Sequence, residues 1–110
     1  MSGKFKINQS NDRQFYFVLH AANGEPILVS ETYVTKDGAR RGIESVRNNA
    51  SMDRRYQRKV SISNEHYFTL HAANGEPIGT SEMYSSPASR NVGIESVKIN
   101  AVNAVIEVLV

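Results

Sequence analysis

A tyrosine, a histidine and a glutamate occur together twice in this sequence, and these residue types can orient a proton or hold a small polar ligand. The two sets are Tyr16, His20 and Glu31 and, 51 residues further along, Tyr67, His71 and Glu82. The structural interpretation is that they form cross-strand pairs on a half-exposed sheet face, each contributing about 0.2 to 1 kcal/mol. We favour the structural role and keep both sets as a candidate ligand or partner surface.

The other residues that could do chemistry lack the spacing that it requires. His20, His66 and His71 show neither the i, i+4 spacing of helical metal ligands nor a cysteine companion, because the sequence has no cysteine. Ser45 and Ser96 lie in Gly-Ile-Glu-Ser-Val segments that lack the second glycine of a nucleophile elbow. We therefore predict a non-enzymatic binding or structural module with no catalytic residues, no metal and no cofactor.

A basic segment lies near the middle of the chain, where four cationic residues surround Tyr56: Arg54, Arg55, Arg58 and Lys59. Cations beside the exposed tyrosines of a sheet can hold single-stranded nucleic acid through phosphate contacts and base stacking. Most charged linkers are simply solvated, and the net charge is only +2. Nucleic-acid binding is therefore an alternative function and not our first.

Charge is divided unevenly along the chain. Residues 1–64 contain eleven Lys/Arg and six Asp/Glu, whereas residues 65–110 contain two and five. The basic half of one molecule could attract the acidic half of another, and an exchange of strands between two molecules could convert a monomer into a homodimer. Self-association or binding to another protein is the second alternative, and the sequence leaves both the partner and the choice between monomer and homodimer open.

The chain is a tandem duplication: residues 15–50 recur as residues 66–101, with about 21 of 36 aligned positions identical. Each copy is too short to bury a stable core alone, so we expect one domain over residues 1–110, made of two repeats at about 3–53 and 54–110. The absence of cysteine fits a reducing compartment. The segment MSGKFKINQS lacks the apolar region of a signal peptide, and no apolar run approaches membrane-spanning length, so we expect a soluble, cytoplasmic protein.

Each repeat is predicted to contain three strands and a helix. Apolar and polar residues alternate over 15–21 and 66–72, which is typical of a strand with one buried face. The Asn-Gly pairs at 23–24 and 74–75 then predict two-residue type I′ hairpin turns. Such a turn sets this register: Leu19 opposite Leu28, His20 opposite Ile27, and Tyr16 opposite Glu31.

Helices are expected after Thr35 and after Ser86, which are suitable N-cap residues. Gly42 and Gly93 lie beside the apolar stripe of each helix, where a glycine allows close packing. Residues 104–110 are rich in β-branched side chains and predict a final strand, with a helix as the alternative. Because such an apolar end must be covered, we expect it to pair with another strand of the same molecule.

The pattern F-x-L-x-A-x-N-G-x-x-I-x-x-S-E-x-Y, followed by G-I-x-S-V, resembles the YegP-like family of small bacterial proteins, which are built from a tandem domain of unknown function. In the first repeat it falls on Phe17, Leu19, Ala21, Asn23, Gly24, Ile27, Ser30, Glu31, Tyr33, Gly42, Ile43, Ser45 and Val46. The resemblance implies an α+β fold in which two β3-α-β units form one largely antiparallel sheet, pack two helices on one face and exchange their C-terminal strands. It implies no activity, because the family has no established biochemical role.

Overall fold

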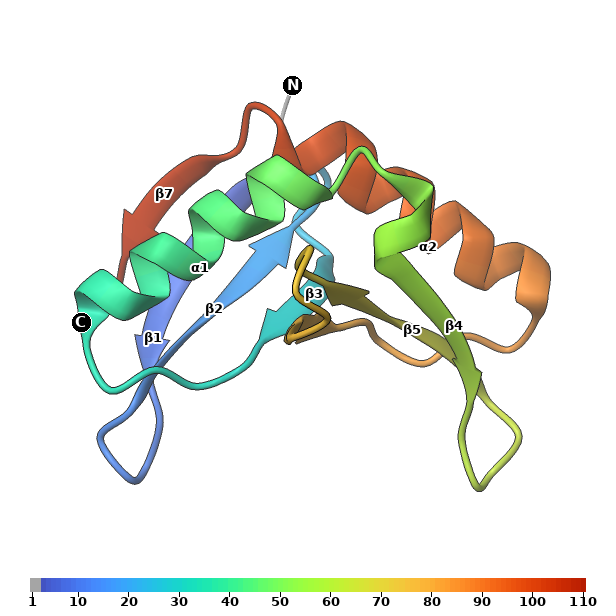
Figure 1. The fold of residues 1–110 in the computed structure, drawn as a ribbon, viewed down its shortest axis with the longest axis horizontal. Coiled ribbons are helices and arrows are strands. Elements are labelled where there is room, and N and C mark those ends of the chain that lie inside the picture. The colour runs from blue at the N-terminus through green and yellow to red at the C-terminus, as the bar shows by residue number, and fades with distance from the viewer. Residues whose placement is uncertain (1–2) are drawn as a thin grey trace.

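The computed structural model describes residues 3–110 and contains seven strands, two α-helices and one short 3-10 helix. The first repeat contains β1 (Lys4–Gln9), β2 (Phe15–His20), β3 (Pro26–Ser30) and α1 (Lys36–Asn49). The 3-10 helix η1 (Asp53–Arg55) leads into β4 (Tyr56–Val60), β5 (His66–His71), β6 (Pro77–Thr80), α2 (Pro87–Ala101) and β7 (Val105–Val108). One sheet runs in the order β4-β5-β6-β3-β2-β1-β7, and both helices cover the same face (Figure 1). The predicted α+β class is confirmed.

The two repeats join at the centre of the sheet, where β3 pairs antiparallel with β6. Val29 lies opposite Thr80 there. These are equivalent positions of the duplication, so the approximate two-fold axis passes between them. The buried core lies between the sheet and the helices, and both repeats contribute to it: its largest fully buried side chains include Phe5, Phe17, Leu19, Leu28, Phe68 and Leu70.

The C-terminal segment forms a strand that crosses to the other repeat, as predicted. β7 pairs in parallel with β1, with Phe5 opposite Ile106, and so lies at one edge of the sheet (Figure 1). The exchange runs in this direction only, because the chain leaving α1 turns through η1 directly into β4, the first strand of the second repeat. Seven strands therefore result, where two complete β3-α-β units would give eight.

The predicted type I′ turn is wrong. Ala21 donates its N–H to Glu25 at 2.8 Å and Gly24 donates to Ala21 at 2.9 Å, while Gly24 alone in this turn has a positive φ, 89°. This is a three-residue loop in which a type I turn ends in a left-handed glycine and a bulge. The extra residue shifts the register, so that His20 faces Pro26 and not the expected Ile27.

A second bulge changes the expected pairing of Tyr16 with Glu31. The Oγ atom of Ser30 accepts a hydrogen bond from the backbone N–H of Phe17 at 2.8 Å, where a strand partner would normally offer a carbonyl. Between the Val18–Val29 pair and the Phe15–Tyr33 pair, the chain after β3 holds one residue more than β2. Ser81 forms the same bond to Phe68 in the second repeat, at 2.9 Å.

The helix boundaries follow the predicted caps. Thr35 Oγ1 accepts from the N–H of Gly38 at 2.9 Å, and Ser86 forms a capping box with Ser89, with Pro87 in the first turn of α2. Within residues 3–110, neither helix combines the length and the apolar character that crossing a membrane requires.

Candidate functional site

Two grooves lie at equivalent places between the repeats, each formed by the helix of one repeat and the β-hairpin of the other. The α2 groove has a volume of about 530 Å³, and the α1 groove has a volume of about 410 Å³. Six types of lining residue are common to both. In the α2 groove they are Tyr84, Gly93 and Ser96 from the second repeat and Glu25, Pro26 and Ile27 from the first; the α1 groove has their counterparts 51 positions away.

Tyr84 lies at the floor of the α2 groove. It reaches this place because the chain that follows β6 continues to run alongside β5. His66 and Tyr84 exchange two backbone hydrogen bonds, at 2.8 and 2.7 Å. The Tyr84 ring stacks on Phe68 with an interplanar angle of 12°. Its hydroxyl reaches Gly93, where an added Cβ atom would lie only 2.3 Å from the oxygen. The close packing predicted for the helix glycines is therefore a contact with a tyrosine, and Tyr33 meets Gly42 in the same way.

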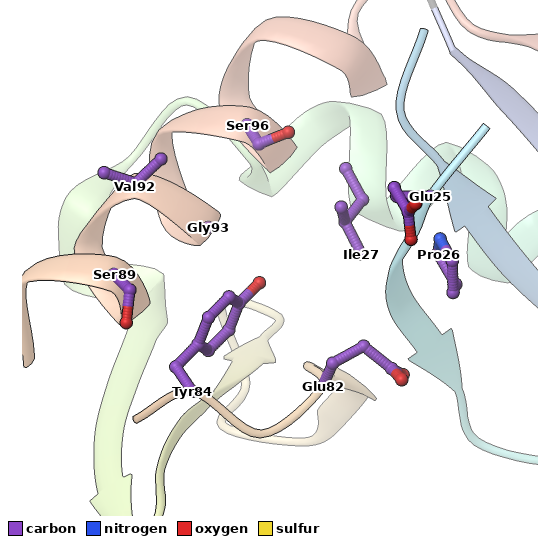
Figure 2. A pocket seen from close by; sticks show the side chains of 9 residues that line it. All are labelled: Glu25, Pro26, Ile27, Glu82, Tyr84, Ser89, Val92, Gly93 and Ser96. Atoms are coloured by element: carbon purple, nitrogen blue, oxygen red, sulfur yellow. The ribbon is translucent and has the colours of Figure 1, made fainter. Parts of the chain in front are cut away.

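The Tyr84 hydroxyl points into the groove, toward the space between Gly93 and Ile27 (Figure 2). Within residues 3–110, the Tyr84 hydroxyl forms no hydrogen bond with another protein atom. Burial raises the pKa of Tyr84, and the negative charge of Glu82 raises it further. The phenol is thus protonated at neutral pH, and its oxygen and proton are both available to a ligand.

The two grooves differ in charge. The α2 groove is lined by the carboxylates of Glu25 and Glu82, and none of its described lining residues is cationic. In the α1 groove Arg41 occupies the position that Val92 holds in the α2 groove, and it forms an ion pair with Asp37. The duplication has therefore kept the shape of the site and changed its electrostatics.

The histidines of the two predicted sets are held by the hairpin turns. His20 Nδ1 lies 3.1 Å from the carbonyl oxygen of Gly24, and His71 Nδ1 lies 3.1 Å from that of Gly75. The second ring nitrogen of His71 also lies 2.7 Å from Thr69 Oγ1. β2 and β5 are separated by β3 and β6, so the two histidines are about three strand spacings apart.

Within residues 3–110, no hydrogen bond joins the glutamates of the predicted sets to their tyrosines. Glu82 lines the α2 groove, and Glu31 lies close enough to Tyr33 to raise its pKa, after the larger effect of burial. Tyr16 and Tyr67 lie on β2 and β5, on the face opposite the core. A joint ligand role for the six residues remains a prediction.

The basic segment does not form a single cationic surface. Arg54 and Arg55 lie in η1, whereas Arg58 and Lys59 lie in β4. Arg55 donates to Asn49 at 2.8 Å, and Arg58 forms an ion pair with Asp53 at 3.2 Å. Since successive strand residues point to opposite faces, Arg58 and Lys59 are directed to different sides of the sheet. The cations that the sequence places together are thus dispersed in space.

Sequence reasoning missed the residues that shape the grooves. Asn100 is buried, accepts from the N–H of Ala22 at 3.1 Å and donates to the carbonyl of Ser96 at 2.8 Å. It therefore ties α2 to the β2–β3 hairpin, the two elements that form the walls of the α2 groove. The sequence does show that a tyrosine occurs at this position in both repeats, as Tyr33 and Tyr84. No neighbouring residue indicates, however, that each tyrosine faces the hairpin of the other repeat.

Comparison with known proteins places the chain in a family. The profile described as "Domain of unknown function (DUF1508)" matches residues 10–57 and again residues 62–107. The chain belongs to this family. The UPF0339 protein YegP of Escherichia coli K12 is 46% identical over 107 residues, which is 97% of each chain. The expected family and its tandem repeat are confirmed.

Two solved structures share the fold. The solution NMR structure of the E. coli yegP protein, a protein of unknown function, has a TM-score of 0.93 and 45% identity, with 99% of this chain and 94% of that chain covered. A UPF0339 protein from Shewanella oneidensis has a TM-score of 0.92 and 49% identity, with 99% and 92% covered. The architecture is therefore common to the family, and none of these names records an activity.

Proposed function

We propose that this protein is a non-enzymatic binding module whose ligand occupies the α2 groove. The observation that carries the proposal is the orientation of the Tyr84 hydroxyl. This hydroxyl forms no hydrogen bond with the described residues and points into a groove whose apolar walls include Ile27 and Val92. Small-molecule sites typically combine a concave, mostly apolar surface of about 300 to 1,000 Å³ with a few polar groups that fix orientation. The α2 groove has this combination of size and lining.

The side chains of the groove support binding and not catalysis. Nucleophilic catalysis needs a nucleophile beside a general base, and the ionisable groups described in this groove are Tyr84 and the two carboxylates of Glu25 and Glu82. A phenol whose pKa is raised stays protonated at neutral pH. It serves there as a hydrogen-bonding group that orients a ligand.

An NMR fragment screen tests the proposal. We expect fragments with one apolar ring to shift the backbone amide signals of Ile27, Tyr84 and Gly93. The variant Val92→Arg should abolish these shifts, because it introduces the residue type found in the α1 groove. Val92 is 68% exposed, so this substitution leaves the core intact. A screen in which no fragment shifts these signals, or in which Val92→Arg binds as well as the wild type, would exclude the proposal.

Self-association is a second candidate function, and the edge strand β7 favours it. Val105, Val108 and Leu109 are exposed on or beside this edge, which carries Glu107 and no lysine. Exposed apolar edge strands offer a template for pairing with another chain. Light scattering should then show a dimer that Val108→Lys dissociates, whereas a wild-type monomer at millimolar concentration would exclude this candidate.

Nucleic-acid binding has less support than either candidate. It requires the four cations of the basic segment to act together, and two of them already have partners in α1 and η1. Binding that is micromolar or weaker, without a steep dependence on salt in an anisotropy titration, would remove it.

A further inference from the structure

We infer that the ligand of the α2 groove is an organic cation, a protonated amine attached to a compact apolar body. This inference rests on the proposed binding function and adds the chemical class of the ligand. The groove provides the site, and its charge selects the ligand.

The two carboxylates of the α2 groove lack ion-pair partners. The acidic residues on the helices are paired: Asp37 with Arg41, Glu44 with Arg47 at 2.7 Å, and Glu95 with Lys98 at 3.2 Å. Among the described residues, no cation lies within ion-pair distance of Glu25 or Glu82. A ligand that removes these carboxylates from water must replace the hydration that they lose, and a cation does so.

The two carboxylates also lie on one side of the groove. Figure 2 shows Glu25 and Glu82 on the side of the β2–β3 hairpin, with Val92 and Gly93 of α2 on the opposite side. An ammonium group placed by the carboxylates would direct an attached apolar body toward the helix. This arrangement matches a ligand with one charged end and one apolar end.

Tyr84 is compatible with an ammonium group. An ammonium group has only donors, and a phenol oxygen can accept a hydrogen bond while the phenol remains protonated. The negative charge of Glu82, which raises the pKa of Tyr84, would also attract the ammonium group. The three oxygen-bearing side chains of Glu25, Glu82 and Tyr84 therefore favour a donor of positive charge over a neutral or anionic group.

The α1 groove provides an internal control. Arg41 stands there in place of Val92, and its side chain is 73% exposed. Its positive charge opposes the entry of an amine and shortens the apolar wall. Although the grooves are related by the duplication, we therefore expect one amine to bind per chain.

Three probes of similar shape and different charge test the inference: 2-phenylethylamine, 2-phenylethanol and 3-phenylpropionate. Isothermal titration calorimetry and amide NMR shifts should rank the amine first and the carboxylate last, with one site per chain. The double variant Glu25→Gln, Glu82→Gln should weaken the amine roughly fivefold and leave the alcohol unchanged, since exposed ion pairs contribute modestly. Glu76→Gln, the counterpart of Glu25 in the α1 groove, should change nothing.

The outcomes separate the inference from the function on which it rests. Equal binding of amine, alcohol and carboxylate, or an unchanged amine affinity in the double variant, would overturn the inference and leave a binding groove without charge selection. Fragments that bind only when neutral or anionic would have the same meaning. If neither these probes nor the wider fragment set shifts the signals of Ile27, Tyr84 and Gly93, the proposed function fails and the inference fails with it.

Discussion

Leu28 packs over Gly79 at the junction of the two repeats. The two residues occupy equivalent positions of the duplication, on either side of the approximate two-fold axis between Val29 and Thr80. A Cβ atom on Gly79 would lie 2.9 Å from Leu28 Cγ and 3.0 Å from the carbonyl oxygen of Val29. Two equal leucines would collide here, so one repeat contributes the side chain and the other the space for it.

Gly79→Ala is therefore expected to destabilise the protein by roughly 1 to 3 kcal/mol, because the new methyl group overpacks the junction. Leu28→Ala should cost about 2 to 5 kcal/mol through the cavity that it leaves. In the double variant the methyl group added at position 79 enters that cavity. The loss in free energy of unfolding should therefore be smaller than the sum of the two single losses. Urea denaturation of the four proteins measures this coupling, and strictly additive free energies of unfolding would contradict it.

The β1–β2 hairpin contains a strained residue. Arg13 has a φ of 66° at the position where the β2–β3 hairpin has a left-handed glycine, and Asn64 has a φ of 63° in the β4–β5 hairpin. Arg13→Gly should raise the free energy of unfolding by about 0.5 to 1 kcal/mol, and Asn64→Gly should raise it by less because asparagine tolerates this conformation. The matched control is Arg40→Gly in α1, which should lower it by about 1 kcal/mol. A lower free energy of unfolding in Arg13→Gly would contradict the conclusion that the backbone is strained at Arg13.

Stability is expected to fall at alkaline pH because three tyrosines are held protonated in the fold. Burial raises the pKa of Tyr33, Tyr84 and, most strongly, Tyr56, whose hydroxyl donates to the carbonyl of Ala50 at 2.6 Å. The unfolded phenols ionise from about pH 10, so this contribution is complete below that pH and is lost as the pH rises toward the folded-state pKa values.

Tyr56→Phe tests the alkaline effect directly. At neutral pH the variant should lose roughly 1 kcal/mol with the hydrogen bond to Ala50. Above pH 10 its free energy of unfolding should fall less steeply than that of the wild type, so the two curves should converge. Urea titrations from pH 7 to 11 measure this, and parallel curves would show that Tyr56 does not contribute to the pH dependence.

The elements that sequence reasoning predicted correctly depend on local chemistry. The cap at Thr35, the alternation along β2 and the β-branched C-terminus each act over a few residues. The predictions that failed involve bulges. The Ser30 hydroxyl replaces a backbone acceptor, and the extra residue between the Val18–Val29 and Phe15–Tyr33 pairs replaces the regular pairing that was expected for Tyr16 and Glu31. The grooves could not be predicted because Tyr84 and Ile27 come to line one groove only after the two repeats have docked.

The prediction of a single domain over residues 1–110 can be tested by dividing the chain. Residues 1–53 alone would leave β1 without β7 and expose the face of Leu28 that packs over Gly79. Neither 1–53 nor 54–110 should show a cooperative thermal transition by circular dichroism, and mixing the two should restore one. A half that melts cooperatively as a monomer would show that each repeat folds independently.

Arg41→Val should create a second but weaker amine site, because the described lining of the α1 groove includes Glu76 but not Glu31, the counterpart of Glu82. The substitution gives the α1 groove the residue that Val92 supplies in the α2 groove, and it removes the cation from a groove that Glu76 also lines. Calorimetry with 2-phenylethylamine should then report two sites per chain where the wild type has one. Arg40→Val, at the neighbouring exposed helix position, should leave the stoichiometry at one. If Arg41→Val still binds a single amine, the charge difference between the grooves does not set their selectivity.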